Sequence, residues 1–517
     1  MHRDVAAARI VLSPFFTRAR SCPCKPAQLR MKSTCAGGFR GACGFPPRLF
    51  HPRVRAVEDS LVRRRVAIAG ASGFVGRALA ARLSERFEVV GIARRAPEQA
   101  CSFADFRTAD LFNLRDAERA LEGADVAVYL VHSMLPSARL TQGDFADFDL
   151  ICADNFARAA QKAGVSQIVY LGGLIPEGPL SPHLRSRREV EQTLASRGVP
   201  VTVLRAGLVL GGGGSSFAIL AKLARRLPVM ICPRWMETRT QAVALQDVLA
   251  LLDYVVGRPE HAGETYDVGA PEVMSYRELM TLTAEVLGLR RPMLPVPFFS
   301  PGLSRLWVSL VTGAPKELVG PLVESLRHEM IARDLRLNEA AGLVPTPTRE
   351  ALEQALAEPE AAPAPPTAGR TQRASTPRSL VRSVQRMRLP DRKNAAWAAD
   401  EYARWLPGAL SSLIRAEVRS DRSFEFFLVG VKRPMLVLTA APERSTPDRQ
   451  LFFVTDGWLV SKSSRGRFEL RQVLDDRTLL TAIHDFAPSL PWWLYRQTQA
   501  RFHALVMALF RRHLLRA

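Results

Sequence analysis

The stretch that decides the fold is RVAIAGASGFVGRALAARLSERFEVV, residues 65–90. Its first apolar run, residues 66–69, is short and ends at a glycine, which is typical of a strand buried on both faces of a parallel sheet. Gly70, Gly73 and Gly76 follow in a G-x-x-G-x-x-G pattern. Apolar residues then recur at helical spacing until a second apolar run begins. The stretch therefore predicts a strand, a glycine turn, a helix and a second strand.

This glycine pattern has a chemical interpretation. The first glycine allows a tight turn, the second lets the main chain approach a pyrophosphate, and the third lets the helix lie close to the sheet. The helix start then presents free N–H groups and a partial positive charge to the phosphates. We expect a nucleotide-binding half, and the alternative is a glycine turn used only for packing.

The composition of the 517 residues indicates a multidomain protein with real cores, since 47% are hydrophobic. The net charge of +21 is concentrated in two segments, because residues 1–65 contribute +11 and residues 361–393 contribute +7. The remaining chain is close to neutral and shows no RNA-binding signature, recognition helix or zinc-finger spacing. We expect no nucleic-acid partner.

Cysteine usage and hydropathy indicate the compartment. No window of 18 apolar residues occurs, which argues against a membrane span. The seven cysteines form no disulfide framework, so we expect a reducing, cytoplasmic location. We interpret residues 1–60 as a disordered basic tail. The alternatives are a translated upstream region, a transit peptide and a metal knot, but the tail cysteines lack zinc spacing, and we expect no metal site.

Strand and helix patterns alternate after the glycine unit, with strands expected at residues 125–131, 165–171 and 199–210. This alternation predicts an α/β, Rossmann-type, doubly wound parallel sheet with ligand at the carboxyl ends of its strands. Arg94 and Arg95 end the second strand, where a basic residue meets a 2′-phosphate, and therefore favour NADP(H) over NAD(H). We expect the glycine run after the 199–210 strand to be a mobile lid connection, because no helix pattern follows at once.

Several ordered motifs now carry a specific resemblance: GASGFVGRALAARL, ADLFN, DVAVYLVHS, IVYLGGL, VPVTVLRAGLVLG, QAVALQDVLALL and GETYDVGAPEVMSYRELM. Over residues 66–345 the chain resembles the extended and atypical short-chain dehydrogenase/reductases. It is most similar to their NmrA-like and complex I accessory-subunit-like NAD(P)-binding branch. The resemblance implies a Rossmann-type sheet, a bound NAD(P) and a small substrate region from about residue 228.

The same resemblance implies the cofactor contacts. Asp110 and Leu111 would lie against the adenine, and His132 and Ser133 near the nicotinamide ribose. The candidate cofactor-binding residues are Gly70, Ala71, Ser72, Gly73, Phe74, Val75, Gly76, Arg94, Arg95, Asp110, Leu111, His132, Ser133 and Gly172.

The catalytic set departs from the pattern of this family. A typical member has a serine after the fifth strand and the pattern Y-x-x-S-K-x-E on the next helix, whereas this chain has His183 at the tyrosine position and Arg187 at the lysine position. Gly172 and Gly173 stand where the serine would be. Arg187 can hold the ribose, and His183, with an ordinary pKa near 6.5, can carry the proton. The alternative is a surface that kept its cofactor contacts and lost turnover.

Two later segments have several interpretations. The apolar residues 298–311 favour a core helix, and the alternatives are a roof over a hydrophobic substrate cleft or a contact with a membrane surface or subunit. Residues 356–394 are rich in Pro and Ala, then in Arg and Ser, which is typical of a linker. A surface amphipathic helix in its basic half is the alternative.

Residues 395–517 read as a helix, several strands with turns between them, and a long terminal helix. This order resembles the helix-grip domain of the START-like superfamily, which implies a smaller α+β domain with a cavity for an apolar ligand. A filled core is the alternative. His484 and His503 have no ligand partners at metal spacing, so we interpret both as structural.

The expected protein is an NAD(P)-binding, oxidoreductase-like domain at residues 61–355 followed by the linker and the START-like domain. It would transfer a hydride to or from a hydrophobic carbonyl or alkene, with His183 as the proton donor and Arg187 fixing the ribose. A non-catalytic module that senses NADP(H) or supports an assembly is the second hypothesis. A nucleotide-sugar epimerase or dehydratase is the third.

Overall fold

A computed structural model describes residues 63–97, 102–132, 140–296, 301–358, 380–409, 414–462, 464–474 and 477–517. The basic tail with its four cysteines lies outside the described residues, as do Ser133 and most of the Pro- and Ala-rich segment.

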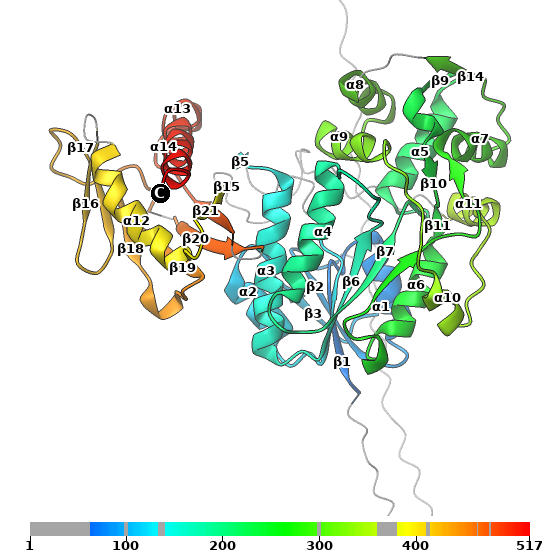
Figure 1. Cartoon of the computed structure of the whole chain (residues 1–517), viewed down its shortest axis with the longest axis horizontal. Coiled ribbons are helices and arrows are strands. Elements are labelled where there is room, and N and C mark those ends of the chain that lie inside the picture. Colours follow the sequence, from blue (N-terminus) through cyan, green and yellow to red (C-terminus); the bar gives the residue numbers. More distant parts are fainter. Residues whose placement is uncertain are drawn as a thin grey trace, which may run out of the picture. The chain divides into compact units, whose positions relative to one another are not determined.

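A seven-stranded parallel sheet forms the centre of the N-terminal domain (Figure 1). Its strands, in spatial order, are β12 (Thr265–Val268), β7 (Val201–Ala206), β6 (Gln167–Gly173), β4 (Val126–Tyr129), β1 (Arg65–Ala69), β2 (Glu88–Ala93) and β3 (Asp105–Thr108). The chain adds β2 and β3 on one side of β1, then crosses over and builds outward on the other side. This confirms the predicted doubly wound Rossmann-type sheet.

Helices cover both faces of this sheet (Figure 1). Alternate residues of a strand face opposite sides, so Val66 and Ile68 pack with α1 and α6, whereas Ala67 and Ala69 pack with α2, α3 and α4. These helices are α1 (Phe74–Leu83), α6 (Leu245–Val255), α2 (Leu114–Leu121), α3 (Phe145–Ala163) and α4 (Pro182–Ala195). Both strand faces are therefore buried, as the continuous apolar runs predict.

A second layer of helices, from the part of the chain after β7, forms its own hydrophobic core. Its helices are α5 (Ser215–Arg226), α7 (Tyr276–Val286), α8 (Pro301–Thr312), α9 (Lys316–Ser325) and α11 (Thr348–Ala357), with α10 (Arg336–Ala340) packed nearer the sheet. Short strand pairs connect these elements: β8 (Val209–Leu210) with β11 (Val243–Ala244), β9 (Met230–Pro233) with β14 (Met293–Val296), and β10 (Arg239–Thr240) with β13 (Met274–Ser275).

The glycine run at residues 211–214 differs from the expected mobile lid connection. Helix α5 begins directly after it, with Gly214 as its N-cap. A Cβ atom on Gly211 would lie 2.6 Å from Cζ of Phe74, and the Gly212 amide donates to Glu358. These glycines therefore permit close packing against the turn after β1.

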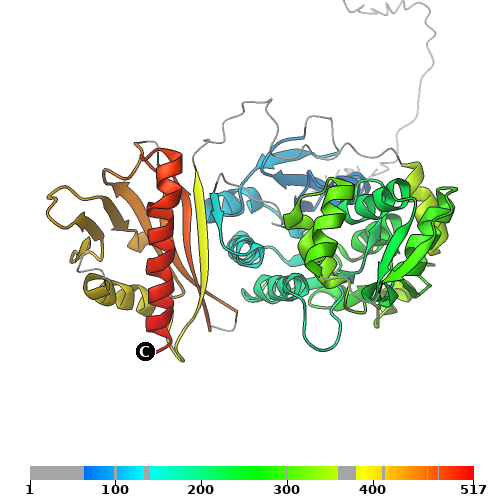
Figure 2. The same ribbon diagram turned by 90° about the horizontal axis from the view of Figure 1, so that it is seen from above.

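The C-terminal domain is built on an eight-stranded mixed sheet. Its strands, in spatial order, are β16 (Ile414–Val418), β17 (Phe424–Leu428), β18 (Leu436–Ala440), β19 (Arg449–Asp456), β20 (Arg467–Val473), β21 (Thr478–Phe486), β15 (Val381–Arg388) and β5 (Leu140–Gln142). Helix α12 (Ala395–Ala409) and the terminal helices α13 (Trp492–Gln497) and α14 (Gln499–Leu514) complete the domain. Figure 2 shows α14 running alongside β15.

Strand β15 corrects the predicted linker, because residues 381–388 lie inside a sheet. The prediction was wrong because a segment rich in arginine resembles a solvent-exposed linker, whereas here the arginines lie in a largely buried strand. Arg382 pairs with Asp110, and Arg386 donates to Asp147 at 2.7 Å, so carboxylates more than 200 residues away neutralise these charges. Strand β5, from the N-terminal domain, pairs in parallel with β15.

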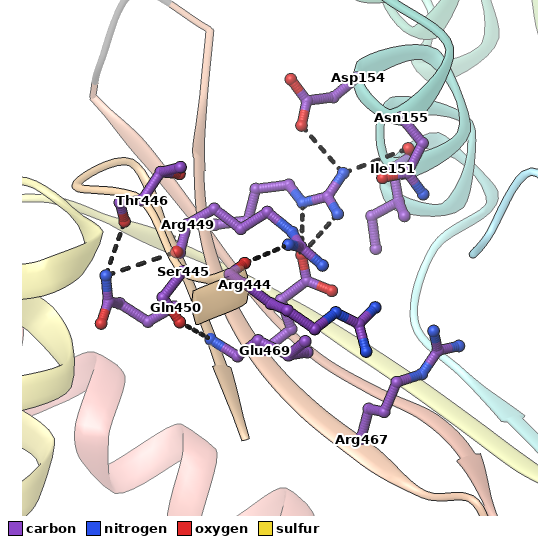
Figure 3. Close-up of polar contacts among 12 residues, drawn as sticks. Ile151, Asp154, Asn155, Arg444, Ser445, Thr446, Arg449, Gln450, Arg467 and Glu469 are labelled. Atoms are coloured by element: carbon purple, nitrogen blue, oxygen red, sulfur yellow. Dashed lines mark hydrogen bonds and ion pairs between the residues drawn. The ribbon is translucent and has the colours of Figure 1, made fainter. Parts of the chain in front are cut away.

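A buried charge network joins the C-terminal sheet to α3 (Figure 3). Glu469 accepts from Arg449 and Arg471, and Arg471 donates onward to Asp154 of α3 at 2.9 Å. Arg158 in turn bridges Asp154 to the C-terminal domain. Because these groups are buried and paired, their charges are compensated without water.

The described residues contain no membrane-spanning helix and no metal-binding cluster. None of their helices combines the length and apolar character needed to cross a bilayer. Their histidines, cysteines and carboxylates form no group of three or more placed to hold a metal ion.

Candidate functional site

The glycine turn after β1 leaves no room for side chains at two positions. Gly70 has a φ of +88°, and a Cβ atom there would lie 3.0 Å from the Leu130 carbonyl oxygen. A Cβ atom on Gly76 would lie 2.9 Å from the Cα of Ala71 and would overlap the Gly70 carbonyl. The helix therefore approaches the turn as closely as the glycine pattern predicts.

The start of α1 presents unpartnered main-chain donors. Its N-cap, Gly73, provides no capping side chain, and the first turn contains no acidic residue. The amides of residues 74–76 precede the first i to i−4 bond, which runs from the Arg77 amide to the Gly73 carbonyl at 3.1 Å. Such a helix start suits an anionic group, so the turn fits the diphosphate of a dinucleotide.

The two arginines expected at the 2′-phosphate lie beside this turn. Arg94 and Arg95 follow β2 directly and are exposed. The amides of Gly70 and Ala71 donate to the Ile92 carbonyl at 3.0 and 3.2 Å, which fixes the turn against the end of β2. The structure therefore brings the glycines and arginines to one edge of the sheet.

Asp110 and Leu111, expected at the adenine, follow β3 at the same edge. Leu111 is buried, and its carbonyl accepts from Asn155 at 2.7 Å. Asp110 forms an ion pair with Arg382 of the C-terminal domain. This partner could not be predicted from the sequence, because Arg382 lies in the segment expected to be a linker.

A cavity of about 360 Å³ opens at the carboxyl ends of β6 and β7. Gly172 and Gly173 line it from β6, His183 and Arg187 from α4, and His132 from the residues after β4. The other walls are mostly apolar and come from the helices of the second layer; they include Leu220, Leu223, Met236, Met280, Trp307, Val308 and Val323. Its size and lining suit a hydrophobic small molecule.

Helix α8 covers part of this cavity. Trp307 and Val308 line the cavity, whereas Leu306 and Leu310 on the same helix are exposed. For the described part of residues 298–311, the structure therefore supports two of the interpretations: α8 packs in a hydrophobic core through Val308, and it also roofs the cleft.

One end of the cavity is polar and centres on Asp149 of α3. Its Oδ2 accepts from Nη2 of Arg187 at 2.6 Å and lies 2.9 Å from Nδ1 of His132. Ser186 donates to the same oxygen at 3.3 Å. The rings of His132 and His183 are 5.3 Å apart between centroids. The two predicted catalytic residues are thus in one cluster with His132.

Burial and charge set the protonation of this cluster. Burial, with the nearby His132 and Arg187, lowers the pKa of His183 to about 3. Burial and Arg187 also lower the pKa of His132. Burial opposes the charge on Arg187, yet Tyr170 and Asp149 raise the pKa of its guanidinium. At neutral pH the cluster therefore holds two neutral imidazoles beside an Arg187–Asp149 ion pair.

This protonation changes the expected role of His183. Sequence reasoning assigned it the ordinary pKa near 6.5, at which an imidazolium gives up its proton. An imidazole with a pKa of about 3 is uncharged at neutral pH and instead offers a hydrogen bond.

Three nitrogen atoms of the cluster are buried and have no hydrogen-bond partner among the described residues: Nε2 of His132, Nδ1 of His183 and Nε of Arg187. A buried polar atom without a partner costs about 1–3 kcal/mol. Such atoms at the polar end of an apolar cavity therefore favour a ligand that carries oxygen there.

Sequence reasoning missed Asp149, which organises this cluster. Its signal was an aspartate between Phe148 and Leu150 on an apolar helix, where an unpaired carboxylate would be costly. Gly172, predicted to bind the cofactor, lines the cavity, and a Cβ atom there would lie 3.0 Å from Cε1 of Tyr170, so a serine would crowd that ring.

Comparisons with known proteins agree with this geometry. Residues 70–225 match the NAD(P)H-binding family model. The chain is 30% identical over 249 residues to an uncharacterized protein of Mycobacterium tuberculosis, covering 47% of this chain and 25% of the relative. It thus spans about a quarter of the length of that relative.

Two further proteins are similar to about half of this chain. The (4-alkanoyl-5-oxo-2,5-dihydrofuran-3-yl)methyl phosphate reductase of Streptomyces griseus is 26% identical over 291 residues, which cover 54% of this chain and 90% of the reductase. A solved NADPH-dependent quinone oxidoreductase from Escherichia coli covers 56% of this chain and 98% of its own, with 20% identity and a TM-score of 0.45. The parallel sheet, the glycine turn and the family match together show that the N-terminal part of this chain is an NAD(P)-binding Rossmann-like domain.

Proposed function

We propose that this protein is an NADP(H)-dependent oxidoreductase that transfers a hydride to or from a carbonyl or alkene of a hydrophobic small molecule. The observation that carries the proposal is the apolar cavity of about 360 Å³ with a polar cluster at the strand ends of a dinucleotide-binding sheet. A nicotinamide cofactor, when bound, supplies the hydride.

The residues of this chain would hold the cofactor at three places. The amides of Ser72 and of residues 74–76, at the start of α1, would bind the diphosphate. Arg94 or Arg95 would bind a 2′-phosphate, which is the basis for preferring NADP(H). His132 would lie at the ribose near the polar cluster. Ser133, expected beside it, stays a prediction outside the described residues.

The polar cluster would act on the oxygen of the substrate. A neutral imidazole of His183 donates a hydrogen bond to a carbonyl oxygen and stabilises the negative charge that develops there. Arg187, fixed by Asp149, would supply a second donor through its unpartnered Nε. The apolar walls would strengthen both interactions. Hydride transfer to a carbonyl carbon leaves an alkoxide, and the proton that completes the alcohol would come from solvent water that reaches the polar end of the cavity.

Binding without turnover is the second candidate. Arg187 Nη2 already lies 2.6 Å from Asp149 rather than free to hold a ribose, and His183 is not a ready acid. Under this alternative, the domain senses NADP(H) through the same turn.

Turnover assays separate the two candidates. Purified protein with NADPH is given a panel of hydrophobic aldehydes, ketones, enones and quinones, and NADPH oxidation is followed at saturating cofactor. Hydride transfer predicts turnover with at least one member of the panel and a loss of about 100-fold in kcat for His183→Ala. His183→Gln, which keeps an N–H donor, should recover part of the loss.

The matched control is His328→Ala, which changes a histidine outside the cavity and should leave kcat unchanged. Saturable NADPH binding with no turnover of any acceptor would reject the oxidoreductase and favour the binding module. Equal kcat for wild type and His183→Ala would reject the role of His183 alone.

A further inference from the structure

Exposed apolar side chains gather at one end of the C-terminal sheet. Leu428, Val429 and Val431 are exposed where β17 turns toward β18, and Val429 has an exposed fraction of 57%. Trp458, in the loop after β19, is also exposed, and Trp493 of α13 is 70% exposed. Single apolar side chains on a surface are ordinary, whereas a group of them marks an interaction site.

Hydrogen bonds hold the three segments that carry these side chains together. The Trp458 amide donates to the Pro434 carbonyl at 3.3 Å, which joins the loop after β19 to the turn between β17 and β18. The Ser489 hydroxyl donates to the Trp458 carbonyl at 2.6 Å, and α13 begins shortly after Ser489. The exposed side chains therefore belong to neighbouring segments, and we call them the apolar tip: Leu428, Val429, Val431, Trp458 and Trp493.

The segments of the apolar tip are basic. Residues 428–434, 456–465 and 489–497 contain five lysines and arginines and one acidic residue, which gives a net charge of +4. The acidic residue, Asp456, accepts from the Gly457 amide at 2.7 Å. The basic residues are all exposed: Lys432, Arg433, Lys462, Arg465 and Arg496. The surface therefore combines exposed apolar groups with positive charge.

This combination suits an anionic bilayer better than a protein partner. The core of a protein interface is depleted of charged residues, and of lysine in particular. At a bilayer, apolar groups enter the interface, tryptophan rings lie at the level of the headgroups, and basic side chains attract anionic lipids. Lys432 and Arg433 directly follow Val431, and their aliphatic stems can accompany it inward while their charges stay in water.

We propose that the apolar tip docks the C-terminal domain on the surface of a bilayer that contains anionic lipids. Val429, Val431 and Trp493 would enter the interface, and the five basic side chains would contact lipid phosphates. This docking needs no dinucleotide, so it is independent of the proposed oxidoreductase function.

Quenching of tryptophan fluorescence tests the proposal with the full-length protein. The vesicles contain phosphatidylcholine with brominated acyl chains and phosphatidylglycerol. Residues 1–65 and 361–393 are also basic and attract anionic lipids, but neither segment contains tryptophan. Quenching by the bromines therefore reports contact of the folded domains with the bilayer. We expect saturable quenching at about 25% phosphatidylglycerol and much weaker quenching with phosphatidylcholine alone.

Two double variants locate the contact. Trp458→Phe with Trp493→Phe removes the tryptophans of the apolar tip and should remove most of the quenching. Val429→Ser with Val431→Ser keeps every tryptophan and every charge. It should raise the lipid concentration at half-maximal quenching by about tenfold, because less apolar surface leaves water. Val344→Ser is the control, since Val344 is 87% exposed in the N-terminal domain, and it should change nothing.

Absence of quenching of the wild-type protein by the anionic brominated vesicles would overturn the proposal, even if a variant fails to fold. Equal quenching of the wild type and the double phenylalanine variant would overturn it as well. Sedimentation velocity without lipid gives a further test. A wild-type dimer that becomes monomeric in the double serine variant would assign the apolar tip to a second copy of the chain and reject the bilayer.

Discussion

At the residue scale, the proposed hydride transfer depends on the protonation of His183. Its burial beside His132 and the Arg187 guanidinium lowers its pKa to about 3, so the side chain is neutral over the whole physiological range. The proposed hydrogen bond from His183 to the substrate oxygen requires this neutral imidazole. A role as an imidazolium acid would instead require the ordinary pKa near 6.5.

The pH profile of kcat distinguishes these roles. With a pKa of about 3, His183 does not titrate between pH 5.5 and 8.5, so its contribution to kcat should be constant there. The measurement is kcat at saturating NADPH and substrate across this range, for wild type and His183→Gln. A tenfold fall per pH unit above about pH 6.5 in wild type only would show that an imidazolium is needed.

We expect Arg94 to determine the cofactor preference, because it follows β2 directly and lies beside the glycine turn. Arg94→Ala removes a charge that only NADPH, with its 2′-phosphate, would contact. We expect its Kd for NADPH to rise by about tenfold or more, corresponding to about 1.4 kcal/mol or more, with the Kd for NADH unchanged.

Titrations with both cofactors test this prediction, and Arg119→Ala, an exposed arginine of α2, is the control. Equal weakening of NADPH and NADH would remove the basis for an NADP(H) preference.

At the element scale, the close approach of α1 to the turn after β1 explains the third glycine. An alanine Cβ at residue 76 would overlap the Gly70 carbonyl oxygen, which is main chain and cannot rotate away. We expect Gly76→Ala to shift α1 outward, lower Tm and abolish measurable NADPH binding.

Gly408→Ala is the matched control, because no atom lies within 4 Å of a Cβ there and alanine favours a helix. Thermal unfolding and NADPH titration of both variants measure the effect. Unchanged NADPH affinity in Gly76→Ala would show that the turn does not hold the cofactor.

The sequence predicted elements whose determinants are local. The glycine spacing and the apolar runs define β1, α1 and β2, and the predicted parallel sheet is confirmed. Strand β15 was missed because its arginines can be buried only where carboxylates neutralise them, and these carboxylates, such as Asp110 and Asp147, are distant in sequence. Strand β5 was missed because three residues carry too little pattern.

In the candidate site, too, the sequence predicted only what depends on residues close together in the chain. His183 and Arg187 meet because they lie four residues apart on one helix. Their partner Asp149 comes from another helix, and the lowered pKa of His183 arises from burial that no local pattern reveals. The resemblance to START-like domains stays a prediction, although the order of α12, the antiparallel strands and α14 agrees with it.

At the scale of the whole molecule, the described residues of the two domains form one common hydrophobic cluster and several ion pairs with each other. Val384, Val473 and Leu480 of the C-terminal sheet pack in the same hydrophobic cluster as α2 and α3. Arg471 is buried and pairs with both Glu469 and Asp154. We therefore expect the two domains to unfold together.

Arg471→Leu tests this coupling. Leucine removes one cation from the buried network, so Glu469 keeps only Arg449 and Asp154 keeps Arg158 and Arg197, and we expect a cost of about 3 kcal/mol in the free energy of unfolding. The exposed Arg277, paired with Glu237, provides the control, because Arg277→Leu should change stability by less than about 1 kcal/mol. Denaturant unfolding measures both. Separate transitions for the two domains in the wild-type protein would contradict the shared core.

The proposal depends most on the glycine turn at residues 70–76, whose free amides at Ser72 and at residues 74–76 would hold the diphosphate of a pyridine dinucleotide against the start of α1. Isothermal titration calorimetry of folded wild-type protein with NADPH tests it most directly. We predict saturable binding with one site per chain, tighter for NADPH than for NADH. An absence of binding heat with NADPH, NADP⁺, NADH and NAD⁺, over a range of temperatures on protein shown to be folded, would contradict it.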